Sequence, residues 1–210
     1  MREARTLPGA ASRPAAVLVP IYWSGSEGWR FVLVRRGPRG AHAGEIAFPG
    51  GKPERSDPDL AATAVREAAE ETGVRPSGVE LLTSLPIVQT RQSGFSIHPY
   101  LARITPPTRW APDAREIDAV VPVAASALTD CAVRLPHHRA PIPAKPAEAD
   151  VPCFQLDDSI IWGATYRILA PLVSLLATPT LRWTVLAGPP PHGPMARRNR
   201  RGHAASLPNG

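Results

Sequence analysis

Apolar runs broken by turn-forming residues divide much of the chain into segments that favour β-strands. Residues 15–23 and 31–36 form the first two runs, and the Gly- and Ser-rich segment 24–28 between them predicts a hairpin. A short apolar patch at 45–48 leads into Pro49-Gly50-Gly51, where we expect a tight loop to end any regular element. The later runs that predict strands are 79–89, 95–104 and 117–123.

The region before Gly73 carries the signals of a helix that covers about residues 58–72. Pro58 suits a first helical turn, and Ser56 or Asp57 can cap it. Gly73 supplies the stop. The sequence therefore predicts a helix with a well-marked beginning and end.

A second helix is predicted over about residues 163–177, and the Pro- and His-rich stretch 135–152 predicts a surface loop. Strands lie before, between and after the two helices, so we expect an α/β or α+β sandwich around a mixed sheet. A chain of 210 residues that is 43% hydrophobic has the size of one domain. We place that domain at 14–187, after a flexible lead at 1–13.

Residues 188–210 form a tail rich in Pro, Gly and Arg, which predicts disorder. Its four arginines contribute +4 to the net charge of +6, so the rest of the chain has nearly equal numbers of positive and negative charges. We therefore do not expect a nucleic-acid partner, and a polyanion-binding tail is the alternative.

The cysteines and the longest apolar segments argue against a disulfide-rich protein, a zinc–thiolate protein and a membrane protein. Cys131 and Cys153 lack the short spacing of a zinc or redox motif, so we expect neither a disulfide nor a thiolate metal site, which fits a reducing cytoplasm. Residues 15–23 are too short to cross a bilayer, and 160–176 are interrupted by an arginine and a proline. We expect no membrane partner and no signal peptide.

The first helix places three glutamates, Glu67, Glu70 and Glu71, opposite a face rich in alanine. Glutamates three and four residues apart repel one another, and only Arg66 lies among them. A divalent cation such as Mg²⁺ would resolve that repulsion, because it prefers carboxylate oxygens. A solvated acidic surface is the alternative, as on many Glu-rich helices.

Two glycines, Gly50 and Gly51, precede this helix and allow a backbone amide or carbonyl to face a metal or a phosphate. Together with the acidic helix, they predict a site that binds phosphate. Gly51, five residues, Asp57, and then the run from Arg66 to Val74 resemble the Nudix box. The second half matches fully. In the first half Asp57 replaces the usual glutamate, and one extra residue separates it from Arg66.

The same two departures occur in the Nudix enzymes that hydrolyse coenzyme A, so the chain resembles that subgroup. The run 42–51 is similar to the signature of that subgroup, and Arg35 stands at the position of its upstream arginine. Gly40 stands where the subgroup usually has another arginine, and Arg39 is the neighbouring substitute. Further segments that resemble later landmarks of the subgroup are 93–95, 99–100, 116–117, 121–123 and 161–165.

The resemblance implies a Nudix fold, that is, an α/β/α sandwich around a mixed sheet with a loop-helix-loop catalytic motif. It also implies Mg²⁺ or Mn²⁺ as cofactor. Glu67 and Glu71 are the expected principal metal ligands, with Glu70 as a further ligand or as the base that orients water. Arg66 is expected to orient the glutamates, with direct substrate contact as the alternative. Gly51 completes the expected metal site.

The resemblance further implies a small-molecule diphosphate as substrate. The expected substrate-binding residues are Arg35, Arg36, Arg39, His42 and Gly50. The candidates for the 3′-phosphate of coenzyme A are Arg35, Arg36, Arg39 and Arg91, and ordinary solvated arginines are the alternative. Glu116 is either a general base from outside the box or a plain surface acid.

The leading hypothesis is a diphosphatase that converts coenzyme A or a derivative to 3′,5′-ADP and 4′-phosphopantetheine or its acyl form. The alternatives are a Nudix hydrolase of ADP-ribose, a dinucleotide or another nucleoside diphosphate derivative, and a non-catalytic Nudix module that senses a ligand. A second copy of the chain, in a homodimer, is a further possible partner.

Overall fold

The structure is a computed structural model that describes residues 12–39, 42–90, 94–135, 151–156 and 158–177. The tail predicted at 188–210, residues 1–11 of the predicted lead, Gly40 and Arg91 lie outside the described residues. The last residue of the predicted lead, Arg13, already belongs to the first strand.

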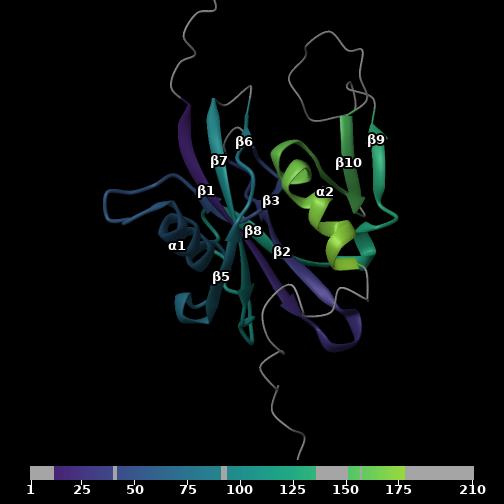
Figure 1. Cartoon of the computed structure of the whole chain (residues 1–210), viewed down its shortest axis with the longest axis horizontal. Coiled ribbons are helices and arrows are strands. Elements are labelled where there is room, and N and C mark those ends of the chain that lie inside the picture. The colour runs from purple at the N-terminus through teal and green to yellow at the C-terminus, as the bar shows by residue number, and fades with distance from the viewer. Residues whose placement is uncertain (1–11, 40–41, 91–93, 136–150, 157, 178–210) are drawn as a thin grey trace, which may run out of the picture.

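A mixed sheet of eight strands forms the centre of the fold (Figure 1). Strand β1 lies between β7, which runs parallel to it, and β2, which runs antiparallel. Strand β5 pairs with β7 and lies at one edge, and β8 pairs with β2. The strands are β1 (Arg13–Trp23), β2 (Trp29–Arg36), β3 (Ile46–Ala47), β4 (Gly50–Gly51), β5 (Val79–Ser84), β6 (Val88–Gln89), β7 (Phe95–Ile104) and β8 (Ile117–Ala124).

One helix packs on each face of this sheet, as the predicted α/β/α sandwich requires (Figure 1). Because alternate residues of a strand point to opposite faces, β1 serves both layers. Ala16 and Leu18 join the cluster that includes α1 (Leu60–Thr72), whereas Val19 and Ile21 join the cluster that includes α2 (Gly163–Ala177). Neither helix has the length and hydropathy of a membrane span, within the part of the chain that the structure describes.

A second sheet of three antiparallel strands, β9 (Ala132–Leu135), β10 (Val151–Leu156) and β11 (Ser159–Ile161), is absent from the sequence expectations. The surface loop predicted at 135–152 is wrong at both ends, because Leu135 pairs with Val151, and residues 136–150 of it lie outside the described residues. All three strands are short, and β9 pairs with β10 across a long intervening segment, which local periodicity does not record. Phe154 and Ile161 are buried in the same cluster as α2.

Two other boundaries differ from the sequence expectations. The predicted tight loop at Gly50-Gly51 is strand β4, which pairs with β1. The strand predicted over 79–89 is two strands, β5 and β6, separated by a segment that contains Pro86. Proline cannot donate a backbone hydrogen bond to a neighbouring strand, so the ladder breaks there.

Candidate active site

Both ends of α1 are fixed by local contacts, so the positions of its acidic residues are well determined. Asp59 caps the helix, and its carboxylate accepts a hydrogen bond of 2.8 Å from the Ala62 amide. The prediction that Ser56 or Asp57 caps it is wrong, because the first helical residue is Leu60. Gly73 ends the helix in the left-handed conformation, with φ of 77°.

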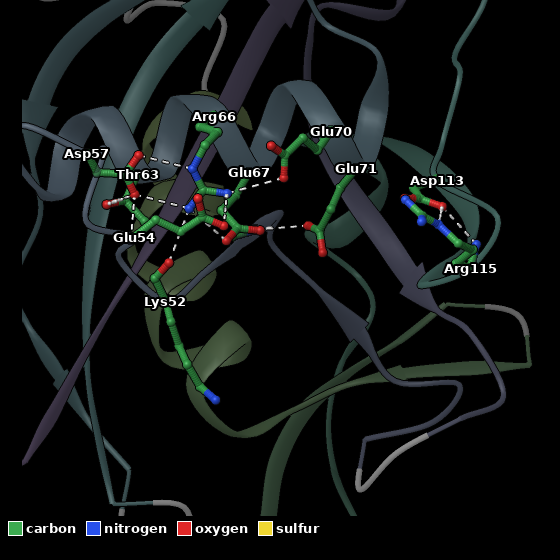
Figure 2. Close-up of polar contacts among 11 residues, drawn as sticks. Lys52, Glu54, Asp57, Thr63, Arg66, Glu67, Glu70, Glu71, Asp113 and Arg115 are labelled. Carbon is green, nitrogen blue, oxygen red and sulfur yellow. Dashed lines mark hydrogen bonds and ion pairs between the residues drawn. The ribbon is translucent and has the colours of Figure 1, made fainter.

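Asp57 is bound to Arg66 through two hydrogen bonds, Nε to Oδ1 at 3.0 Å and Nη2 to Oδ2 at 3.1 Å (Figure 2). Its carboxylate also accepts from the Glu54 amide at 2.9 Å and the Thr63 hydroxyl at 3.0 Å. The Arg66 guanidinium, followed by the Glu54 amide, holds the pKa of Asp57 well below its usual range. The shorter side chain and the extra residue that distinguish this box therefore still allow a two-point contact with the arginine.

The remaining donors of Arg66 bind the rest of the cluster (Figure 2). Nη1 contacts Glu70 at 3.2 Å, and Nη2 contacts Glu67 at 3.1 Å. Nη2 also donates to the backbone oxygen of Lys52 at 3.2 Å, which ties the glycine strand to the helix. Arg66 therefore contacts two of the three glutamates of the helix.

The Glu67 carboxylate occupies the space in which a side chain at Gly51 would lie. A Cβ added at Gly51 would be 2.5 Å from Cδ of Glu67 and 2.8 Å from its Oε2. The sequence predicts a role for Gly51 in its backbone freedom, but the close approach of the Glu67 side chain explains the glycine directly. Burial is the main reason why the pKa of Glu67 is raised.

Glu71 is buried, with 4% of the residue exposed, and its Oε2 accepts a 2.9 Å hydrogen bond from the Gly50 amide. Burial raises its pKa to about 7, and the negative charges of Glu67 and Glu116 add to the effect. The Gly50 amide and the positive charge of Arg36 oppose it. The separation of α1 into a packed face and an acidic face is therefore incomplete, because Glu71 lies at the boundary between them.

These acidic groups have the chemistry of a site for a hard divalent cation. Glu67 and Glu71 lie one helical turn apart and present oxygen donors, and both have raised pKa values. Among the described residues, no three His, Cys, Asp or Glu side chains converge on one point. The reason is that Glu67 and Glu70 turn towards Arg66, whereas Glu71 turns towards Gly50. The donors fit Mg²⁺ or Mn²⁺, since a cation would offset the burial and repulsion that raise both pKa values.

Some of the other predicted site residues lie beside this cluster. Arg36, at the end of β2, and Glu116, just before β8, both affect the pKa of Glu71. The backbone positions Glu116, because the Gly37 amide donates to its carbonyl oxygen at 2.7 Å. Gly50 contributes its amide to Glu71.

Arg35 and His42 have other partners. Arg35 lies 3.9 Å from Asp118 and donates to the Ser159 hydroxyl at 3.2 Å, so it joins the two sheets. His42 contacts Glu45 at 3.1 Å within its own loop. The remaining member of the predicted substrate set, Arg39, is exposed.

Sequence reasoning missed three residues of the cluster. These are Glu54, whose amide binds Asp57 and whose carboxylate lies 3.9 Å from Nη1 of Arg66, Thr63 through its hydroxyl, and Lys52 through its carbonyl. A signal exists for the first, since an aspartate in a loop commonly binds a nearby backbone amide. The other two contacts depend on how the loop folds over the helix.

A model of the NUDIX domain family matches residues 12–139, more than half of the chain, and this stretch contains the whole cluster. The chain belongs to the Nudix family. The proteins named "Uncharacterized Nudix hydrolase NudL" from Klebsiella pneumoniae and Pectobacterium atrosepticum are 39% identical over 109 residues and 38% identical over 111 residues. The matches cover 51% and 52% of this chain and 55% and 56% of those proteins, so this Nudix chain spans about half the length of these relatives. It is also similar to the crystal structure of a Nudix hydrolase from M. smegmatis, RenU, with a TM-score of 0.48 and 21% identity over 57% of this chain and 74% of that one.

Proposed function

We propose that this Nudix protein is a metal-dependent diphosphatase that cleaves coenzyme A or one of its derivatives to 3′,5′-ADP and 4′-phosphopantetheine or its acyl form. The observation that carries the hydrolase proposal is the cluster in which Arg66 joins Asp57, Glu67 and Glu70, with Glu71 buried against the glycine strand. Diphosphate hydrolysis needs charge neutralisation and an aligned water, and such a cluster can organise both.

In this proposal Glu67 and Glu71 are the principal ligands of Mg²⁺ or Mn²⁺, with Glu70 and the Gly51 backbone as further ligands. The cation, when bound, neutralises charge on the diphosphate and makes water more acidic. Arg66 is a positioning residue, because Asp57 holds its guanidinium in a fixed plane from which it contacts Glu67 and Glu70.

Two acids are candidates for the base that accepts the proton of the attacking water. The side chain of Glu70, which contacts Nη1 of Arg66, is 57% exposed, so water can approach it. Glu116 is exposed outside the box, and its negative charge acts on both Glu67 and Glu71. Arg36, whose charge acts on Glu71, is the candidate for contact with a phosphate oxygen.

The coenzyme A part of the proposal is supported by the run 42–51 and by the Asp57 departure. The rival substrates are ADP-ribose, a dinucleotide or another nucleoside diphosphate derivative, and Gly40 is the sequence feature that favours them. The third possibility, a ligand sensor without activity, would be expected to lack box glutamates, whereas Glu67, Glu70 and Glu71 are all present.

The deciding experiment incubates the protein with Mg²⁺ or Mn²⁺ and a panel of coenzyme A, ADP-ribose, NADH and nucleoside triphosphates, with products identified by mass spectrometry. We expect coenzyme A to be the best substrate. Glu67→Gln and Glu71→Gln should each lower kcat by about 100-fold or more, since each removes charge from the proposed metal site. Glu80→Gln, which changes an exposed glutamate paired with Arg103, is the matched control and should be unchanged.

The outcomes separate the parts of the proposal. Preference for ADP-ribose would overturn the coenzyme A assignment alone. Failure to hydrolyse any compound, or full activity in Glu71→Gln, would overturn the hydrolase proposal itself. Circular dichroism of each variant checks that a lost activity is not a lost fold.

A further inference from the structure

Phe95 at the start of β7 is contacted by two cations from different parts of the chain. The guanidinium carbon of Arg13 lies 4.4 Å from the centre of the Phe95 ring, and Nζ of Lys52 lies 5.6 Å from it. Arg13 is the strand partner of Phe95 in the β1–β7 ladder, and Lys52 directly follows β4. Two separate segments therefore each bring a positive charge to an aromatic ring that belongs to a third.

Lys52 connects this ring to the carboxylate cluster. Its backbone oxygen accepts from Arg66, but its side chain extends away from the carboxylates (Figure 2). The ammonium thus lies away from the carboxylates of the proposed hydrolytic centre, while the backbone of the same residue contacts that centre through Arg66. Among the described residues, no acidic side chain forms an ion pair with it. Lys52 is also one of only two lysines among the 24 basic residues of the chain.

A third cation adds to the positive charge at this end of the sheet. Arg167 of α2 is exposed and donates to the backbone oxygen of Gln89 at 2.9 Å. Gln89 is the strand partner of Ser96, the residue after Phe95. Arg167 thus places a third positive charge near the N-terminal end of β7, where Phe95 lies.

An anion would relieve the repulsion between the two cations on Phe95. The aromatic ring attracts each cation, but it does not remove the repulsion between two cations that share it. A phosphate group would, since it accepts the point charge of a lysine and the planar fork of an arginine together. The ring further limits where the two side chains can lie and so prepares them for such a ligand.

We propose that Lys52 and Arg13, held on Phe95, form an anion subsite beside the hydrolytic centre that binds a phosphate monoester of the substrate. This proposal rests on the proposed function and names its substrate class: a diphosphate that carries a further phosphate monoester, such as the 3′-phosphate of coenzyme A. It assigns to Lys52 and Arg13 the phosphate contact for which the sequence suggested Arg35, Arg36, Arg39 and Arg91. Of these four, Arg35 joins the two sheets.

The first test measures binding by calorimetry without metal or turnover. The ligands are 3′,5′-ADP, 2′,5′-ADP and 5′-AMP, and the proteins are the wild type, Lys52→Gln, Arg13→Gln and Arg55→Gln. The wild type should bind 3′,5′-ADP at least about tenfold more tightly than 5′-AMP, since the extra phosphate gains charge-assisted hydrogen bonds. Lys52→Gln and Arg13→Gln should each remove most of this difference. Arg55→Gln, on the same loop and exposed, is the matched control and should keep it.

Equal affinity of the wild type for all three ligands would overturn the subsite. An equal loss for 3′,5′-ADP and 5′-AMP in Lys52→Gln would do the same, because the lysine would then serve the shared 5′-phosphate. A preference for 2′,5′-ADP that Lys52→Gln removes would support the subsite and assign it to a 2′-phosphate.

The second test compares kcat/KM for coenzyme A and 3′-dephospho-coenzyme A, which differ only in the monoester. Lys52→Gln should lower kcat/KM for coenzyme A by about tenfold more than for the dephospho compound. Equal losses on both would contradict the subsite. Hydrolysis of neither compound by the wild type, together with tight binding of 3′,5′-ADP, would overturn the proposed function and leave the subsite standing.

Discussion

Gly50 and Gly51 are adjacent, yet a methyl group added at each would meet different neighbours. At Gly50 the new Cβ would lie 2.6 Å from Cα of Val17 and 2.8 Å from its Cγ1, and would overlap the Ala16 carbonyl oxygen. At Gly51 it would meet only the Glu67 carboxylate among its three nearest atoms, with Cδ at 2.5 Å. One neighbour is the backbone of a central strand, and the other is the end of a flexible side chain.

The two substitutions should therefore fail in different ways. Carbon atoms make contact at about 3.5 Å, so either neighbour must move by about 1 Å. In Gly50→Ala that movement breaks the β1–β4 pairing, and we expect a loss of about 3 kcal/mol in the free energy of unfolding. In Gly51→Ala the Glu67 side chain moves instead, so the free energy of unfolding should stay within about 1 kcal/mol of the wild-type value. A displacement of about 1 Å at the site should lower kcat by about 100-fold.

Urea unfolding followed by tryptophan fluorescence measures the first quantity, and diphosphate hydrolysis with Mg²⁺ measures the second. Gly78→Ala is the control, since its nearest neighbour would lie at an ordinary 3.4 Å. In Gly51→Ala/Glu67→Asp the shorter acid should recover part of the lost activity. Full activity in Gly51→Ala, or equal destabilisation by the two substitutions, would refute the reasoning.

Three further predictions concern the acidic groups. In metal-free buffer the folded state keeps a proton on Glu71 between pH 4.5 and about 7 that the unfolded state has lost, so stability should fall across this range. Glu71→Gln should remove the Glu71 share of this fall, at most about 3 kcal/mol, and leave the smaller share of Glu67, whose pKa is also raised. Urea melts at several pH values would show the difference, and parallel profiles for variant and wild type would contradict it. Asp57→Asn should weaken the two hydrogen bonds that fix Arg66 and so lower metal affinity or kcat by about 10- to 100-fold. A Mn²⁺ titration and activity assays measure these quantities, and unchanged affinity and kcat would contradict the prediction. A chelator should abolish hydrolysis and added Mg²⁺ or Mn²⁺ should restore it, and activity that persists in the chelator would exclude the metal.

The elements that local pattern could identify are those whose signals lie within a few residues. The predicted bounds 163–177 agree with α2, and 95–104 agree with β7, because hydrophobic runs and their Gly and Pro boundaries are local. Helical periodicity likewise groups Glu67, Glu70 and Glu71 on one side of α1 from their spacing alone. The start of α1 was misplaced by two residues, because several neighbouring polar residues can cap a helix and packing selects one.

The tertiary structure decided how those residues are used. Only the fold places the Glu67 carboxylate against Gly51, buries Glu71 and brings Lys52 and Arg13 to Phe95. Arg35 binds a residue 124 positions away, and the second sheet pairs strands on either side of a long segment. Such contacts depend on which distant segments become neighbours, and a local pattern carries no record of that. The sequence by itself thus determined the chemistry available to this protein, and the packing of distant segments determined which groups meet.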